Sequence, residues 1–293
     1  IFGDWDNPYL TMNFAQEANI VRALAKIHEN GHVTRGMKPV NWCLDCTSAL
    51  AEAEVEYQDK ASDAIYVSFD VLDTDKVAAL ADIKGNIVAV IWTTTPWTLP
   101  ANQAISVHPE HDYSVVATAK GNFLLATDLV ESALSEFKLT NDGILATVSG
   151  RELEGLRAQH PLIADRQVPL ILGEHVTTDS GTGLVHTAPG HGLDDYIVGL
   201  KYNLPVENPV SGTGVYLDSA AVFAGEHIYK ANPKIIAALH ENGHLISHTK
   251  IEHSYPHCWR HKSPIIFRAT PQWFISMEKE GLRERALNDI PSV

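Results

Sequence analysis

The sequence contains no long apolar run, only three cysteines and no secretion signal. Nowhere in its 293 residues does an apolar stretch approach the roughly 20 residues needed to cross a bilayer. Residues 1–20 lack the basic start and apolar centre of a signal peptide. Three cysteines are too few for a disulfide framework, which fits a reducing compartment. We therefore expect a cytoplasmic protein without a membrane partner and, because it does not begin with Met, a fragment of a longer chain.

Basic residues are also scarce. The chain has 22 Lys and Arg against 36 Asp and Glu, a formal net charge of −14. A protein that binds RNA mainly through its phosphates needs a basic face, so we expect only weak binding of free RNA. The content of 45% hydrophobic and 20% charged residues is typical of a folded globular protein, and the length allows two domains.

Motifs of several enzyme classes are missing as well. The sequence contains no Gly-x-Ser-x-Gly elbow, no Walker phosphate loop and no Gly-x-Gly-x-x-Gly dinucleotide turn. Serine hydrolases of the elbow type, P-loop nucleotide hydrolases and dinucleotide-dependent oxidoreductases are therefore disfavoured.

Apolar periodicity predicts a chain rich in strands, with scattered helices. Helical spacing covers residues 13–30, 128–138, 193–202 and 232–243, and the first and last of these segments end at Asn-Gly. Alternating or continuous apolar runs predict strands at 65–71, 87–92, 113–118, 123–126, 168–172 and 183–186. Because strands and helices do not alternate regularly, the pattern favours an α+β fold with a barrel-like, β-rich domain and peripheral helices.

A threonine-rich segment follows the predicted strand at 87–92. Pro96 and Pro100 prevent the strand from continuing, so a loop carries the polar side chains of Thr93, Thr94, Thr95, Thr98 and Asn102. Hydroxyl and carboxamide groups both donate and accept hydrogen bonds, which suits a ribose, an ester carbonyl or a positioned water. The alternative is that the threonines have no functional role and occur here because threonine is common in strands.

A glycine-rich turn lies between an apolar strand and a helix in residues 181–196. The strand carries His186, and the glycines allow the backbone to approach a ligand closely. Asp194 and Asp195 fall in the first turn of the helix, where the helix dipole favours carboxylates. Either these residues only stabilise the helix, or a carboxylate faces a small cation such as an α-amino group, with His186 beside it.

All three cysteines belong to two pairs of possible metal ligands, Cys43 with Cys46 and Cys258 with His261. Each pair offers two ligands three residues apart, as in structural zinc sites of Cys₃His type. Because 211 residues separate Cys46 from Cys258, the chain must fold back to form such a site. This predicts a domain inserted into a small zinc module, with boundaries near residues 60 and 250. His257 is the alternative to His261, and cysteines without metal are the alternative to zinc.

The sequence His-Glu-Asn-Gly-His occurs at 28–32 and again at 240–244. It matches the His-Glu-x-x-His pattern of zinc metalloproteases, which requires both histidines on one face of a continuous helix. Asn-Gly ends helices, so the second histidine of each copy should lie beyond the helix. The pattern therefore predicts helix ends and disfavours a protease.

The threonine-rich and glycine-rich segments together resemble the editing domains of class I aminoacyl-tRNA synthetases. The wording Thr-Thr-Thr-Pro-Trp-Thr-Leu-Pro-Ala-Asn with Val-His-Thr-Ala-Pro-Gly-His-Gly is similar to the isoleucyl type. The valyl and leucyl types carry an arginine after the first two threonines. The resemblance extends from Gly3 to Phe274. The His-x-Gly-His and Lys-Met-Ser-Lys-Ser motifs of the ATP site are absent, so we expect no amino-acid activation.

The resemblance implies roles for individual residues. Asp195 holds the substrate α-ammonium, and His186 lines the side-chain pocket, where its bulk excludes isoleucine. Catalytic roles are implied for Thr93, Thr94, Thr95, Asn102 and Asp195, and substrate contacts for His186, Asp195, Thr98, Gly190 and His191. We expect a positioned water, with no metal in this pocket. The zinc ion is expected to be structural and held by Cys43, Cys46, Cys258 and His261.

The resemblance also implies an organisation and a reaction. A zinc-ribbon-like module of residues 1–60 and 250–293 surrounds an editing domain of residues 61–249. The expected reaction is hydrolysis of the ester that joins a wrong amino acid, valine, to the 3′ end of isoleucine tRNA by a double sieve. The rest of the synthetase is the other partner. Valyl- or leucyl-type editing and a non-catalytic tRNA-binding module are the alternatives.

Overall fold

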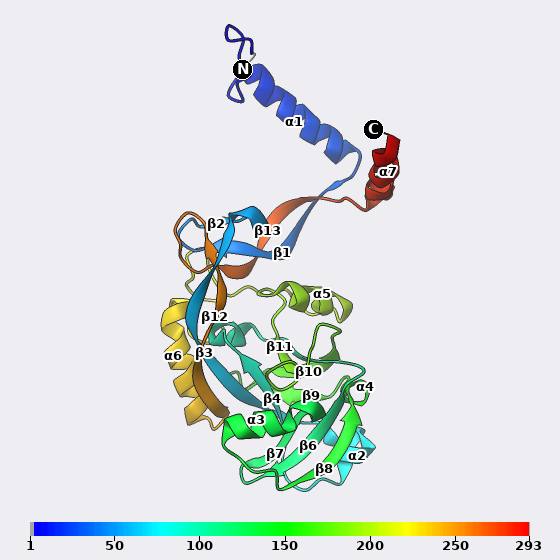
Figure 1. Cartoon of the computed structure of the whole chain (residues 1–293), viewed down its shortest axis with the longest axis vertical. Coiled ribbons are helices and arrows are strands. Elements are labelled where there is room, and N and C mark those ends of the chain that lie inside the picture. Colours follow the sequence, from blue (N-terminus) through cyan, green and yellow to red (C-terminus); the bar gives the residue numbers. More distant parts are fainter. Residues whose placement is uncertain (1–2, 293) are drawn as a thin grey trace. The chain divides into compact units, whose positions relative to one another are not determined.

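The computed structural model describes residues 3–292 (Figure 1). These residues form two compact units. One comprises the chain up to residue 37 and from residue 271 onward, and the other comprises residues 38–270. All the predicted site residues and metal ligands belong to the larger unit.

The smaller unit contains two α-helices and the outer parts of two strands. Its elements are α1 (Phe14–Glu29), β1 (Val33–Cys43), β13 (Ile266–Ile275), η5 (Lys279–Gly281), α7 (Leu282–Asp289) and η6 (Ile290–Ser292). The predicted helix at 13–30 corresponds to α1. The Asn13 side chain accepts a hydrogen bond from the Ala15 N–H at its start, and Gly31 follows its end with a φ of 75°, a conformation that glycine adopts readily. The order β13-β1-β2 defines a three-stranded sheet with β2 (Ser48–Ala49).

The larger unit is built on a ten-stranded mixed sheet. Its order is β11-β5-β10-β9-β3-β4-β7-β6-β8, with β12 paired to β3. The strands are β3 (Val55–Val71), β4 (Ile87–Thr93), β5 (Ala104–Val107), β6 (Asp112–Thr118), β7 (Gly121–Ala126), β8 (Gly143–Ser149), β9 (Arg157–Gln159), β10 (Gln167–Leu172), β11 (Leu184–Thr187) and β12 (Leu245–Cys258). The α+β prediction is confirmed, and the sheet is open, with β11 and β8 as the two ends of that order.

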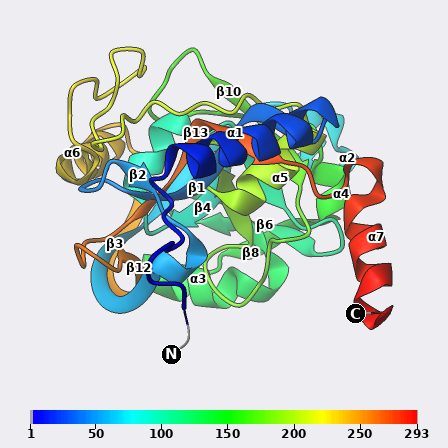
Figure 2. The same ribbon diagram turned by 90° about the horizontal axis from the view of Figure 1, so that it is seen from above.

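Buried apolar side chains, aliphatic and aromatic, hold helix α3 of the larger unit against this sheet. The helix α3 (Val130–Phe137) buries Leu134 and Phe137 against Phe123 of β7, and Figure 2 shows α3 at the sheet from a second direction. The shorter helical elements are η1 (Glu52–Glu54), η2 (Thr74–Lys76), α2 (Ala78–Ala81), η4 (Thr127–Leu129) and α4 (Gly150–Leu153). No helix in residues 3–292 is both long and apolar enough to span a membrane.

The helix predicted at 232–243 begins earlier than expected. It is α6 (Ile228–Glu241), with Pro233 inside it and His227 at its N-cap. Ile228 and Ala231 are fully buried and continue the apolar stripe of Ile235, so their burial favours helix four residues before the predicted start. Proline at this position removes one backbone hydrogen bond and its ring crowds the preceding turn, and the packing of the buried stripe outweighs this cost.

Strands β3 and β12 form a long antiparallel ribbon. Their register runs from Leu245 opposite Val67 to Cys258 opposite Val55, and α6 lies beside the ribbon (Figure 1). The predicted boundaries near residues 60 and 250 fall within these paired strands. The division into a zinc module and an inserted domain stays a prediction.

Candidate functional site

The threonine-rich segment sits where β4 ends. Thr93 is the last residue of β4, and the 3₁₀ helix η3 (Pro96–Ala101) starts three residues later. The Thr98 hydroxyl donates to the carbonyl oxygen of Thr95 at 2.9 Å, which fixes the turn between strand and helix. Three consecutive threonines are thereby held at the strand end, as the two prolines predict.

The glycine-rich turn is held close to that strand end. The strand β11 pairs with β5, which follows η3 in the chain, and places His186 opposite Ile105. The helix α5 (Leu193–Lys201) starts directly after Gly192. Asp195 turns back over the turn, where its carboxylate accepts a hydrogen bond from the Ala188 N–H at 2.8 Å.

One cavity joins the two segments. It has a volume of about 300 Å³ and is lined by seven predicted residues, Thr93, Thr94, Thr95, Thr98, His186, His191 and Asp195, together with Trp92, Val185 and Ala188. The last three were not predicted as site residues, although each lies within a segment singled out from the sequence. Two segments about 90 residues apart in the chain thus form one polar site with an apolar portion.

His186 is fixed by hydrogen bonds on both ring nitrogens. Asn102 lies 2.7 Å from Nδ1 through its amide nitrogen, and the Thr98 hydroxyl lies 2.8 Å from Nε2. The amide nitrogen can only donate, so Nδ1 accepts and Nε2 carries the proton. Burial lowers the pKa of His186 to about 3. The ring is therefore neutral, and its one lone pair is already in use.

Asp195 and His191 are two further polar residues of the cavity lining. Burial raises the pKa of Asp195 to about 7, partly offset by the hydrogen bond from Ala188. The His191 Nδ1 donates to the carbonyl oxygen of Phe267 at 3.1 Å, which leaves a lone pair on Nε2. That Nε2 atom is buried and has no hydrogen-bond partner among the described residues. Burial also lowers the pKa of His191 to about 4, so it is neutral.

Two predicted site residues lie outside the cavity lining. Asn102 is fully buried behind His186 and also donates to the carbonyl of Ala104 at 2.8 Å. Gly190 packs against the chain at Glu207, whose carbonyl oxygen would lie 1.9 Å from an added Cβ. In this structure Asn102 orients the histidine, and Gly190 permits close packing of the turn.

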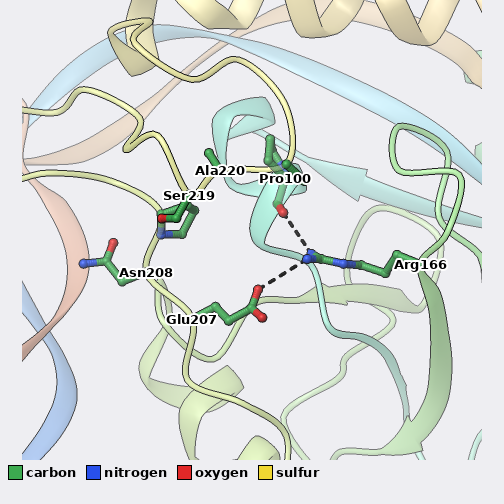
Figure 3. Close-up of a pocket in the computed structure, with 8 residues that line it drawn as sticks. Pro100, Arg166, Glu207, Asn208, Ser219 and Ala220 are labelled. Atoms are coloured by element: carbon green, nitrogen blue, oxygen red, sulfur yellow. Dashed lines mark hydrogen bonds and ion pairs between the residues drawn. The ribbon is translucent and has the colours of Figure 1, made fainter.

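Arg166 braces the far end of the threonine-rich segment. Its guanidinium donates to the carbonyl oxygens of Pro100 at 3.0 Å and Asn102 at 3.2 Å, and it lies 3.4 Å from the Glu207 carboxylate (Figure 3). Pro100, Arg166 and Glu207 border another cavity, with a volume of about 300 Å³. No sequence pattern links Arg166 to residues more than 60 positions away, so the sequence could not indicate this brace.

The four predicted metal ligands come together. The ligand atoms of Cys43, Cys46, Cys258 and His261 all lie within 4.8 Å of one another, and the sulfurs of Cys46 and Cys258 are 3.8 Å apart. Zinc–sulfur bonds of about 2.3 Å at the tetrahedral angle separate two sulfurs by about 3.8 Å, so the donor set fits a tetrahedral ion. His257 is not part of the cluster, and its Nδ1 lies 2.8 Å from the carbonyl of Tyr255.

The two His-Glu-Asn-Gly-His segments end helices, as predicted. Helix α1 ends at Glu29 and α6 at Glu241. His32 and His244 therefore lie beyond their helices, and neither forms part of the clustered metal donors found among the described residues. The geometry required of a metalloprotease is absent from both segments.

Comparison with known proteins identifies the family to which the chain belongs. The family profile described as tRNA synthetases class I (I, L, M and V) matches residues 1–293. The chain is 88% identical over 293 residues to the isoleucine–tRNA ligase of Psychrobacter arcticus and 63% identical over 296 residues to that of Acinetobacter baylyi, covering 100% and 99% of this chain. The solved editing domain of P. falciparum cytosolic leucyl-tRNA synthetase is similar in fold, with a TM-score of 0.51 at 10% identity over 64% of this chain and 98% of that one.

The chain corresponds to only part of each ligase. The chain spans 31% of the length of each of the two ligases, so it corresponds to about a third of such a protein. The structural likeness, at 10% identity, establishes the fold of the editing domain alone. Because the family profile covers the whole chain, the chain belongs to the class I tRNA synthetases of the isoleucine, leucine, methionine and valine group.

Proposed function

We propose that this chain hydrolyses the ester that joins a wrong amino acid to the terminal adenosine of a tRNA, with valine on isoleucine tRNA as the substrate. The observation that carries the proposal is the single cavity shared by the threonine hydroxyls, His186 and the Asp195 carboxyl. A small aminoacyl ester has three parts, and the cavity offers a different group for each: a carboxyl for the ammonium, an apolar wall for the side chain and hydroxyls for the ester.

The size of the pocket supplies the selectivity. A hydrophobic pocket distinguishes side chains that differ by one methylene by only about 1–3 kcal/mol, a magnitude established for synthetases of this kind. A second pocket that accepts valine and excludes isoleucine corrects the remaining errors. Asp195 anchors the α-ammonium and so fixes the direction of the side chain. His186, held at both nitrogens, forms a rigid wall at its end.

Hydrolysis uses a positioned water. The water oxygen bonds to the ester carbonyl carbon, the bond from that carbon to the ribose oxygen breaks, and a water proton passes to the ribose oxygen. The lone pair of His186 is occupied, so this residue orients substrate and does not act as the base. Threonine hydroxyls hold this water and donate to the developing oxyanion.

A metal ion has a structural role in this proposal. Cys43, Cys46, Cys258 and His261 would hold zinc, which binds only the folded arrangement and stabilises it. None of these four residues lines the threonine–histidine cavity, so the ion takes no part in hydrolysis.

The test is deacylation of valyl-tRNA, made on isoleucine tRNA, by this chain and two matched variants. We expect Asp195→Asn to reduce hydrolysis at least 100-fold, because the ammonium loses its charged partner. The control Asp194→Asn changes the neighbouring exposed carboxylate and should retain activity within a few-fold. Equal activity of both variants would refute the anchor, and binding of tRNA without turnover by the unmodified chain would favour a binding module.

A further inference from the structure

The helix η3 contains one backbone carbonyl that its own hydrogen-bond pattern leaves without a donor. In a 3₁₀ helix each carbonyl oxygen accepts from the N–H three residues later. For the carbonyl of Trp97 that residue is Pro100, which lies inside the helix and has no N–H. Trp97 is buried, so its carbonyl needs a donor from another part of the protein.

The hydroxyl of Tyr216 is that donor. It donates a hydrogen bond to the Trp97 carbonyl oxygen, although Tyr216 lies 119 positions later in the chain. Burial raises the pKa of Tyr216, so the hydroxyl keeps its proton. The backbone of Tyr216 is fixed as well, because its N–H donates to the Glu226 carbonyl at 2.9 Å and its carbonyl accepts from the Gly225 N–H at 3.0 Å. The segment between α5 and α6 thus completes the hydrogen bonding of η3.

Trp97 connects this hydrogen bond with the threonine–histidine cavity. The hydroxyl of the next residue, Thr98, accepts from the Nε2–H of His186 at 2.8 Å. The ring of Trp97 meets that of His191 edge to face, with 5.0 Å between the ring centres. Thr98, His186 and His191 all line the cavity. A displacement of the Trp97 backbone would therefore move Thr98 and loosen the ring of His186.

A neighbouring carbonyl of η3 is less dependent on a single side chain. The Leu99 carbonyl accepts from the Asn102 N–H at 3.0 Å and also lies 3.0 Å from Nε2 of His160. It would keep the backbone donor if the histidine were lost. The Trp97 carbonyl has no N–H at residue 100 to replace the hydroxyl of Tyr216, so this tyrosine is the more critical support.

We propose that Tyr216 is a positioning residue that sets the size limit of the cavity, because it holds η3 and, through Thr98, the ring of His186. This inference rests on the proposed function, since the size limit concerns the side chain of an aminoacyl ester. Tyr216 itself does not line the cavity. Its effect therefore belongs to the selectivity between valine and isoleucine and not to the affinity for tRNA.

The test removes the hydroxyl and then supplies a donor by another route. Tyr216→Phe keeps the ring and leaves the Trp97 carbonyl unpaired. We expect the rate of isoleucyl-tRNA hydrolysis relative to valyl-tRNA hydrolysis to rise about tenfold, the effect of one buried hydrogen bond. When Pro100→Ala is added, the N–H of residue 100 can donate to the same carbonyl, and the ratio should return to within about twofold of the original. An unchanged ratio in Tyr216→Phe, or a raised ratio that Pro100→Ala does not lower, would overturn the inference.

Tyr113→Phe is the matched control for the loss of a buried hydroxyl. Tyr113 is fully buried, and its hydroxyl donates to the Gly183 carbonyl at 2.9 Å and not to η3. This variant should lose comparable stability and keep the selectivity of the unmodified chain.

A second readout needs no hydrolysis. It is the solvent exchange of the His186 Nε2 proton, followed by NMR with isotope-labelled histidine and assigned with His186→Gln. We expect exchange about tenfold faster in Tyr216→Phe than in Tyr113→Phe, and a return to the slower rate when Pro100→Ala is added. Equal exchange in the two tyrosine variants would overturn the role of Tyr216. Hydrolysis of neither ester by the unmodified chain would contradict the proposed function, and the exchange would still decide whether Tyr216 holds the histidine.

Discussion

Burial moves the pKa values of the two main cavity residues in opposite directions. It raises that of Asp195 to about 7 and lowers that of His186 to about 3, because a low-dielectric site disfavours the charged form of either group. At neutral pH the histidine is uncharged, whereas the carboxyl changes its charge within the physiological range. Of the two, Asp195 therefore determines how the site responds to pH.

We predict that kcat/KM for ester hydrolysis rises with pH through about 7. Below that pH the Asp195 carboxyl of the free protein is neutral and holds an ammonium poorly, and above it the carboxylate is present. A profile from pH 5.5 to 7.5 should show the rise caused by this ionisation, and Asp194→Asn should keep the rise at slightly lower pH, because the charge of Asp194 contributes to the raised pKa of Asp195. A profile that is flat over this range would contradict the assignment of Asp195 as the anchor.

The raised pKa of Asp195 also makes the stability of the folded protein depend on pH. A carboxyl with a raised pKa binds its proton more strongly in the folded state, so stability falls as pH rises from about 4 to about 7. An ammonium bound at Asp195 removes this cost by pairing with the charge. The charged Asp195 carboxylate therefore destabilises the protein without ligand more than the protein with a bound ammonium.

A second residue-scale prediction concerns the pocket wall. His186→Ala should allow isoleucyl-tRNA to be hydrolysed, because the ring that limits the pocket is gone. His186→Gln is the control, since a glutamine retains much of the bulk and can still bond to Asn102 and Thr98. Deacylation rates for both esters check this, and continued rejection of isoleucine by the alanine variant would place the wall elsewhere.

At the scale of elements, Arg166 couples β10 to the threonine-rich segment. It precedes β10 directly and binds the carbonyls at the end of η3. We predict that Arg166→Met lowers kcat more than it raises KM, because Asn102 and, through it, His186 lose their fixed positions. Arg157→Met breaks an ion pair with Asp73 that does not line the cavity, and it serves as the control. Equal effects of the two substitutions would exclude a positioning role for Arg166.

The elements differ in how far the sequence could predict them. Strand β4 and helix α1 were predictable because periodicity, prolines and the Asn-Gly stop signal all agree locally. The start of α6 was not, because burial of Ile228 and Ala231 outweighs the local signal of Pro233. The two pairs of metal ligands could be predicted because the two ligands of each pair lie three residues apart in the sequence. The hydrogen bond from Asn102 to His186 and the Arg166 brace depend on sheet order, which no local pattern contains.

At the scale of the whole molecule, the metal cluster joins distant parts of the chain. Cys43 and Cys46 lie at the end of β1 and just after it, and Cys258 and His261 lie at the end of β12 and just after it. We predict that a chelator lowers the midpoint of thermal unfolding by several degrees. Hydrolysis at low temperature should persist, because the cluster is separate from the cavity.

Cys258→Ser should reproduce the effect of the chelator on thermal unfolding, and elemental analysis should give one zinc per chain before treatment. Loss of hydrolysis at once on chelation, with the fold intact, would favour a catalytic metal. An unchanged unfolding midpoint in both cases would show that the cluster holds no ion of structural importance.

The acidic surface charge limits how the whole molecule can bind RNA. With a net charge of −14, long-range attraction to phosphates is weak or repulsive. Under the proposed function, recognition by this chain would therefore depend on the 3′ end in its cavity, and the remainder of a full-length synthetase would hold the body of the tRNA.

The most direct measurement is deacylation of valyl-tRNA and isoleucyl-tRNA, both made on isoleucine tRNA, at high concentrations of this chain. The account predicts loss of valine with retention of isoleucine, since the cavity anchors both ammonium groups and accepts only the smaller side chain. Hydrolysis of both esters at the same rate would contradict the size filter. Hydrolysis of neither, by this chain and also by the full-length ligase, would contradict the editing function itself.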